Sequence, residues 1–293
     1  MIGSRRGRFG PDWPHRERSQ YVRVEDAELH IQRFGSAGRS ILLLHGTGAS
    51  THSMRNLAPA LARECRVLVP DLPGHGESQA ARDASTIGGM ASAMQQLCDT
   101  VECAPDVIVG HSAGAVVGLE MALRSKKPSP LVVGVNAAVE PMQGYALFSP
   151  LAKLLFANAF VPSAFAWLAR REGTAQQLLD QTGTKLDAAA VAFYRRLFTD
   201  ADHVAGALRM MANWDLVAFN RRLGTLRGVL ILINAMDDGT VPARDASAQA
   251  KRVRDGRTIS LRDGGHLVHE VRPEKIADMI LTLPELHALR DAA

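Results

Sequence analysis

The stretch PDVIVGHSAGAVVGLEMAL, residues 105–123, decides the fold of this chain. An apolar run with the character of a strand is followed by a serine between two glycines, and then by a helix-like run of small apolar residues. In this Gly-x-Ser-x-Gly pattern the chain turns so sharply that side chains beside the serine would collide, which requires Gly110 and Gly114. The turn leaves the Ser112 hydroxyl exposed at a helix N-terminus, where the helix dipole favours an oxyanion. We therefore interpret Ser112 as a nucleophile rather than a small residue in a tight turn.

Strands and helices alternate on both sides of this turn. The continuous apolar runs SILLLHG (40–46) and GVLILINA (228–235) are typical of strands buried on both faces, and segments with helical spacing lie between such runs. The alternating pattern of SQYVRV and AELHIQRF (19–34) predicts an antiparallel hairpin near the start. Repeated strand–helix–strand units predict an α/β fold with a mostly parallel central sheet that helices cover on both faces.

This alternation is interrupted once, after the fourth strand of the parallel type. From about 140 to 226 the sequence has helical patterns and no convincing strand, which predicts a helical cap, or lid, inserted into the α/β core. The predicted organisation is a basic N-terminal arm (1–18), a core formed by two segments (19–139 and 227–293), and the cap (140–226).

A serine hydroxyl becomes a useful nucleophile only when a base removes its proton and an acid orients that base. After a nucleophile turn of this kind the expected chain order is serine, acid, histidine, each at the end of a strand. The loop AMDDGTVP offers Asp238 as the acid, with Asp237 as the alternative, and the loop GGHLVHE offers His266 as the base. His269 could share a helical face with His266, but a structural role is favoured over metal ligation.

The oxyanion of an acyl-transfer intermediate needs two backbone N–H groups set in place before the reaction. Ala113, the residue after the nucleophile, is the first expected donor. Thr47, in the loop HGTG (45–48), is the second. Three further histidines lie in loops near these residues, and we interpret them as bracing groups rather than bases: His45, His75 and His111.

The segment YALFSPLAKLLFANAFVPSAFAWLA, residues 145–169, is unusually apolar. Its length approaches that of a membrane span, but Lys153 and two prolines interrupt it, so cap helices packed on the core are favoured. Such helices could also provide an apolar substrate wall or a surface that touches a membrane from one side. The candidate pocket residues are Phe148, Trp167 and Met211; for each, an ordinary place in the core of the cap is the alternative.

Composition bounds the class of protein. A chain of 293 residues with 46% hydrophobic content can form one large domain. The net charge of +4 comes partly from arginines in the first twenty residues, and we expect a solvated arm there rather than a phosphate or headgroup site. No basic patch interleaved with aromatic residues occurs elsewhere, so nucleic acid is not an expected partner.

The cysteines and the N-terminus bear on the compartment. The three cysteines have no CxxC spacing, which predicts neither a disulfide framework nor a zinc site and indicates a reducing compartment. The N-terminus has charge but no apolar segment of the signal-peptide type. We therefore expect a cytoplasmic protein, with peripheral contact of the cap to a membrane as a further option.

Five motifs together resemble the α/β-hydrolase superfamily across nearly the whole chain: LLLHGTGAS, VPDLPGHGES, GHSAG, DGTVP and GGHLVHE. Within it, GPDWPHRE, HGTGASTHS, FSPLAKLL and MMANWDL are similar to the magnesium-chelatase accessory hydrolases encoded with bacteriochlorophyll biosynthesis genes. The resemblance implies a role in photosynthetic pigment synthesis beside magnesium insertion into protoporphyrin IX. One departure is Met54, where the family pattern leads us to expect an aromatic residue.

Two functions follow, and both stay open at this point. The first is a serine hydrolase that acts on an ester or acyl bond of a small apolar molecule, for which a tetrapyrrole is a candidate. The second is a non-catalytic accessory or porphyrin-binding protein that supports magnesium chelatase subunits on a hydrolase scaffold. The chain lacks the phosphate-binding motif of an ATP-driven motor subunit and a cluster suited to magnesium, so no cofactor or metal is predicted. Dehalogenases share the fold but usually carry aspartate where this chain has Ser112, which argues against dehalogenase activity.

Overall fold

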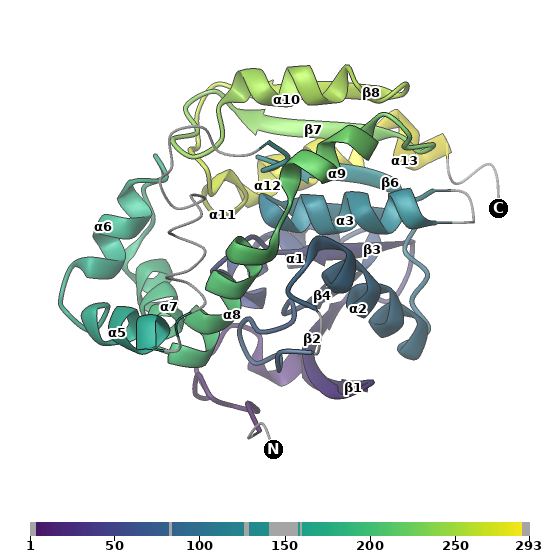
Figure 1. Ribbon diagram of the computed structural model, residues 1–293. Coiled ribbons are helices and arrows are strands. Elements are labelled where there is room, and N and C mark those ends of the chain that lie inside the picture. The colour runs from purple at the N-terminus through teal and green to yellow at the C-terminus, as the bar shows by residue number, and fades with distance from the viewer. Residues whose placement is uncertain (1–3, 82–83, 126–128, 141–157, 159, 289–293) are drawn as a thin grey trace.

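The computed structural model describes residues 4–81, 84–125, 129–140, 158 and 160–288. In this part of the chain eight strands form one sheet, in the order β1-β2-β4-β3-β5-β6-β7-β8 (Figure 1). The strands are β1 (Ser19–Val24), β2 (Ala27–Phe34), β3 (Arg39–Leu44), β4 (Cys65–Pro70), β5 (Val107–His111), β6 (Leu131–Val135), β7 (Leu230–Ala235) and β8 (Gly256–Leu261). β2 is antiparallel to both β1 and β4, and all other neighbours are parallel. The predicted α/β fold with a mostly parallel sheet is confirmed.

Helices cover both faces of this sheet because its central strands are apolar on both sides. In β3, Ile41 and Leu43 belong to the hydrophobic cluster under α1 and α12, whereas Leu42 and Leu44 belong to the cluster under α2 and α3. Figure 1 shows α3 and α9 in front of the sheet and α12 behind it. The helices of the core are α1 (Leu57–Leu61), α2 (Ile87–Thr100), α3 (Ala113–Arg124), α10 (Ala243–Ala250), α11 (Val268–Val271), α12 (Pro273–Leu281) and α13 (Pro284–Ala288), with 3-10 turns η1 (Arg16–Arg18) and η2 (Thr51–Met54).

Between β6 and β7 the described residues form helices and no strand. These helices are α5 (Phe160–Leu168), α6 (Thr174–Asp180), α7 (Ala188–Phe198), α8 (Ala201–Asn213) and α9 (Leu216–Leu223). Figure 1 shows α5, α6 and α7 as a lobe at one end of the sheet. The predicted helical patterns match α5 to α8, while the limits 140 and 226 of the cap stay a prediction.

Helix α9 is the last helix of the segment that the sequence predicts to be helical. The Asp215 side chain caps its N-terminus by accepting a hydrogen bond from the Ala218 N–H at 2.9 Å. Phe219 and Leu223 are buried in the same cluster as Leu230 of β7, so this helix packs on the core. The last helix before β7 therefore already packs against the core of the sheet.

The N-terminal arm is packed against the protein, so the expectation of a solvated arm is wrong. Phe9 and Trp13 are 6% and 2% exposed, and their rings stack with centroids 4.7 Å apart. Both belong to a cluster with Leu197 of α7. Arg5 is 5% exposed, and its guanidinium donates to the Gly76 carbonyl at 2.6 Å. The charge pattern suggested solvation because the groups that receive these side chains are far away in the sequence.

Ion pairs connect this arm to the core and to the cap helices. Arg16 donates two hydrogen bonds to the buried Glu77 carboxylate, at 2.7 and 2.8 Å. Burial acts to raise the pKa of Glu77, but the hydrogen bonds from Arg16 and from the Tyr21 hydroxyl outweigh it, so the net pKa is lowered. On the cap side, Arg8 pairs with Asp202 of α8 at 2.7 Å. The arm thus connects the two parts of the molecule.

Trp13 gives a direct test of this docking. The substitution Trp13→Ala is expected to lower the free energy of unfolding by about 3–5 kcal/mol, because it removes a large buried side chain and leaves a cavity. Urea unfolding followed by circular dichroism measures the change. Trp167→Ala is the matched control: Trp167 is 61% exposed, so its loss should change the free energy by less than about 0.5 kcal/mol. Equal effects of the two substitutions would contradict a docked arm.

Candidate active site

The turn that carries Ser112 joins β5 to α3 near the middle of the sheet. Ser112 has φ 50° and ψ −116°, a backbone conformation that few non-glycine residues adopt. A Cβ on Gly110 would lie 2.4 Å from the Ala115 nitrogen, and one on Gly114 would lie 2.5 Å from the His45 carbonyl oxygen. The predicted steric reason for both glycines is therefore confirmed.

The structure brings together three side chains from separate loops at the carboxyl ends of the strands. The Ser112 hydroxyl lies 3.0 Å from His266 Nε2, and His266 Nδ1 lies 2.8 Å from Asp238 Oδ2. With Nδ1–H donating to the carboxylate, Nε2 is the acceptor for the serine proton. The other oxygen of Asp238 accepts the N–H groups of Thr240 and Val241, at 2.7 and 2.9 Å, which fixes the carboxylate. This is the arrangement that a nucleophile, a base and an orienting acid require.

Ser112 is less accessible than its place at a helix N-terminus suggested. It is 8% exposed and His266 is 6% exposed. The loop after β3 also approaches closely, since a Cβ on Gly46 would lie 3.1 Å from Ser112 Cβ. These side chains therefore lie in a site that is largely removed from solvent, where electrostatic interactions are stronger than in water.

The neighbouring carboxylate, Asp237, has a different position from Asp238. Its two oxygens accept the backbone N–H groups of Gly264 and Gly265, at 3.1 and 2.9 Å. These glycines directly precede His266 and have positive φ angles of 131° and 64°. Asp238 contacts the imidazole, whereas Asp237 holds the loop that carries it. The geometry thus separates the two acids that the sequence left as alternatives.

Asn136 supports the loop that carries His266, and it was not predicted from the sequence. Its amide donates to the carbonyl oxygens of Gly265 and His266, at 2.9 and 2.8 Å. Its side-chain oxygen accepts the Ala235 N–H at 2.9 Å, just before the loop with the acid. Asn136 also has φ 45° and directly follows β6. A polar residue at the end of an apolar strand is the signal that could have identified it.

A short cap segment, residues 182–184, also holds both loops. The carbonyl oxygen of Thr182 accepts the N–H groups of Gly239 at 3.3 Å and His266 at 3.0 Å. The Thr184 hydroxyl oxygen accepts the Leu267 N–H at 2.9 Å. The cap therefore takes part in positioning the acid and the base, which no side-chain pattern in the sequence indicated.

The predicted bracing role is confirmed for His45 and His111. His45 accepts the Leu72 N–H at Nε2, at 2.9 Å, and its Nδ1 lies 2.8 Å from the Gly46 carbonyl oxygen. His111 Nε2 lies 3.0 Å from the His266 carbonyl oxygen. His45 therefore ties two loops together, and His111 supports the loop of the base.

The remaining site predictions are placed as follows. Ala113 is the first residue of α3, and Thr47 follows Gly46 beside the serine. The Thr47 hydroxyl lies 3.5 Å from the sulfur of Met210, which is buried, whereas Met211 is half-buried on the same helix. Trp167 is exposed on α5, with the Arg171 guanidinium 5.2 Å from its ring centroid. Phe148 lies outside the described residues.

Six histidines of the described chain combine burial, with exposures of 3% or less, and a lowered pKa. Burial is the largest influence on each and lowers the pKa, to about 3 for His203 and His269. His269 lies behind the site, with its ring centroid 4.1 Å from that of His111. The buried set, in which every pKa is lowered, is His45, His52, His75, His111, His203 and His269.

This set predicts that the folded state loses stability in mild acid. Because each pKa is lower in the folded than in the unfolded chain, the unfolded chain binds more protons below about pH 6.5, and stability is lost as the pH falls from there. Each such group contributes about 1.4 kcal/mol per pH unit in that window. Glu270, whose pKa burial raises, offsets part of the loss. We expect the free energy of unfolding in urea to fall by several kcal/mol, roughly 3 or more, between pH 7 and pH 5.

The variant His269→Gln tests the origin of this slope. It removes one buried group whose pKa is lowered. The slope of the unfolding free energy against pH should therefore fall by about 1.4 kcal/mol per pH unit, which corresponds to one proton. An unchanged slope would show that His269 does not contribute.

In the described part of the chain, no three His, Cys, Asp or Glu side chains are placed to hold a metal ion.

Comparisons with known proteins agree with the fold. A model of the alpha/beta hydrolase family matches residues 41–279. The magnesium-chelatase 30 kDa subunit of Rhodobacter capsulatus is 39% identical over 274 residues, which is 92% of this chain and 95% of that protein. The fold is also similar to the enol-lactonase of Burkholderia xenovorans LB400 (TM-score 0.71, 22% identity, 89% of this chain and 98% of that one). A thermophilic esterase from Thermogutta terrifontis has a TM-score of 0.70 at 23% identity and covers 93% of this chain and 98% of its own.

Proposed function

Since this chain belongs to the alpha/beta hydrolase family, we propose that it is a serine hydrolase that cleaves an ester or related acyl bond. The observation that carries the proposal is the chain of contacts from Ser112 to His266 to Asp238, at 3.0 and 2.8 Å. All three side chains come from loops at the carboxyl ends of the strands. Backbone N–H groups hold the Asp238 carboxylate in place. A serine placed in this way differs from an ordinary buried serine because its proton has an oriented acceptor.

The proposed mechanism follows from these contacts. His266 removes the Ser112 proton as the hydroxyl oxygen attacks the carbonyl carbon, and Asp238 stabilises the imidazolium that forms. The backbone N–H groups of Thr47 and Ala113 stabilise the oxyanion, a contribution of roughly 3 kcal/mol for each donor. His266 then returns the proton to the leaving group. Water, activated by the same imidazole, releases the acyl group from the serine.

The proposed substrate is a small apolar molecule. The support is the apolar surface of α5, where Phe160 is 81% exposed, Trp167 61% and Leu168 42%. Exposed side chains of this size are typical of ligand, partner or membrane contacts. Among the described residues no helix is long and apolar enough to cross a bilayer. We propose a cytoplasmic protein whose α5 surface can meet a membrane from one side.

A fluorophosphonate probe tests the proposed chemistry, because it forms a covalent bond only with an activated serine. The purified full chain should be labelled in its native state and not after unfolding in urea. Peptide mapping should place the adduct on Ser112. A native chain that stays unlabelled, while a control hydrolase reacts under the same conditions, would overturn the proposal.

A second candidate function is support of magnesium chelatase without catalysis. The observation that favours it is the 39% identity to a protein named as a magnesium-chelatase subunit. In this role the chain would associate with chelatase subunits or hold a tetrapyrrole. A bacteriochlorophyll-producing strain that carries Ser112→Ala separates the two functions. Unchanged pigment would favour the accessory role, whereas accumulation of a tetrapyrrole intermediate, as in a deletion strain, would favour catalysis.

A further inference from the structure

The C-terminus of α2 places two cysteines side by side. The Glu102 N–H donates to the Asp99 carbonyl at 3.3 Å, and the Cys103 N–H donates to the Cys98 carbonyl at 2.8 Å. Glu102 has φ 52°, in the left-handed region. These are the two hydrogen bonds and the residue conformation of a Schellman motif. In this motif the side chains at the positions of Cys98 and Cys103 commonly contact each other.

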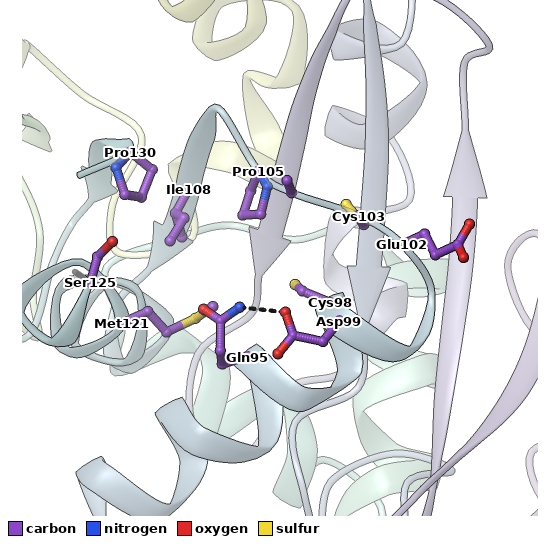
Figure 2. Close-up of a pocket in the computed structure, with 11 residues that line it drawn as sticks. Gln95, Cys98, Asp99, Glu102, Cys103, Pro105, Ile108, Met121, Ser125 and Pro130 are labelled. Carbon is purple, nitrogen blue, oxygen red and sulfur yellow. Dashed lines mark hydrogen bonds between the residues drawn. The ribbon is translucent and has the colours of Figure 1, made fainter. Parts of the chain in front are cut away.

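The two cysteines differ in accessibility. Cys98 is 1% exposed, while Cys103 is half-buried. Both line a pocket of about 440 Å³ at the end of α2, which Figure 2 shows together with Gln95 and Asp99. Cys103 is therefore the more accessible of the two thiols to a molecule from solvent.

The surroundings of Cys103 favour its thiolate. The largest influence is the hydrogen bond from the Cys98 thiol, which lowers the pKa of the Cys103 thiol, while burial acts in the opposite direction. The Ser40 hydroxyl lies 3.2 Å from the Cys103 sulfur, and the charges of Arg33 and Arg66 act in the same direction as these hydrogen bonds. Both arginines line a second pocket that Cys103 also borders. A cysteine of this kind, half-exposed and close to a second thiol, has the features of a redox-reactive site.

We propose that Cys98 and Cys103 are a redox-reactive pair that a peroxide converts to an intramolecular disulfide. The Cys103 thiolate attacks one peroxide oxygen, the O–O bond breaks, and a sulfenic acid and hydroxide form. The Cys98 sulfur then attacks the sulfenic sulfur, and water leaves as the S–S bond forms. The two thiols supply the two electrons that reduce the peroxide, so one peroxide gives one disulfide and two waters.

This modification is independent of the proposed hydrolysis, because Ser112 lies at the opposite end of β5 from the loop with Cys103. It is also compatible with a reducing compartment, where disulfides are transient and redox-sensing rather than structural. The pair was not predicted from the sequence, because the spacing of the two cysteines is informative only once the helix is known to end in this motif.

Oxidation of the reduced full chain with hydrogen peroxide tests the pair. We expect two of the three thiols to be lost, with a mass decrease of two hydrogens and no dimer. Cleavage before Asp99 places the two cysteines on separate peptides, so a disulfide would keep those peptides joined until a reductant is added. Three unchanged thiols, or sulfinic acid on Cys103 without a link, would overturn the proposal.

Variants assign the order of the two steps. In Cys98→Ser the sulfenic acid on Cys103 should persist and react with dimedone, whereas Cys103→Ser should leave the Cys98 thiol unoxidised. Cys65→Ser is the matched control, because Cys65 is 1% exposed and lies in the cluster on the other face of the sheet. It should form the disulfide as the unsubstituted chain does. Loss of the disulfide in the Cys65 variant would contradict the assignment, and circular dichroism identifies any variant that fails to fold.

Discussion

Replacing Ser112 by alanine is expected to lower kcat/KM for a p-nitrophenyl ester by roughly 10⁴-fold or more. The reason is that His266 and Asp238 then have no hydroxyl to activate, although both stay hydrogen-bonded to each other. Initial rates at a series of ester concentrations, measured for freshly purified protein, give the ratio. Because alanine is smaller and the only hydrogen bond of the Ser112 hydroxyl to a described residue is the one with His266, the fold should be kept.

The control for this substitution is Ser163→Ala. Ser163 is an exposed serine of α5, so its loss should leave kcat/KM within about twofold of the original. If the Ser112 variant kept the ester hydrolysis of the unsubstituted chain, another group would be responsible and the proposed role of Ser112 would be wrong. If neither the unsubstituted chain nor the Ser163 variant hydrolysed esters, the accessory function would be the stronger candidate.

Two neighbouring aspartates should respond very differently to the same substitution. Asp238→Asn is expected to lower kcat by roughly 10⁴-fold, because an amide cannot accept the Nδ1–H of His266 as a carboxylate does and the imidazole takes the wrong tautomer. Asp237→Asn keeps one oxygen to accept a hydrogen bond from Gly264 or Gly265, and a cost of roughly tenfold is expected. The same ester assay measures both.

The conservative pair of variants makes the comparison informative. Aspartate and asparagine have nearly the same size, so a large difference between the two positions reports charge and hydrogen bonding rather than packing. A larger loss at Asp237 than at Asp238 would reverse the assignment of the acid. Equal losses would indicate that both variants act by disturbing the loop of His266.

The sequence predicted the parts of the site that depend on local sterics and strand order. Glycine on both sides of Ser112 follows from the turn itself, and the order of serine, acid and histidine follows from the parallel sheet. Asn136 and Thr182 could not be found in this way. Thr182 acts through its backbone carbonyl, which any residue could provide, and Asn136 acts on a loop 129 residues further along the chain.

The N-terminal arm shows a second limit of sequence reasoning. Its arginines read as a solvated run because charge is visible in the sequence, while the buried partners are not. Arg16 pairs with Glu77, 61 residues away, and Arg8 pairs with Asp202, 194 residues away. Trp13, an uncharged aromatic residue in the same arm, is the signal that could have indicated docking, since a large aromatic ring is rarely left in solvent.

The contacts of Thr182 with the loops of Asp238 and His266 have a consequence for motion. Its carbonyl accepts the amide hydrogens of Gly239 and His266, so those amides can exchange with solvent only when this cap segment separates from the core. Local opening at residues 182–184 would therefore remove one backbone support from each of the two loops at the same time. A substrate that entered by lifting this segment would loosen the loops of Asp238 and His266 together, while Asn136 and His111 would still hold the His266 loop.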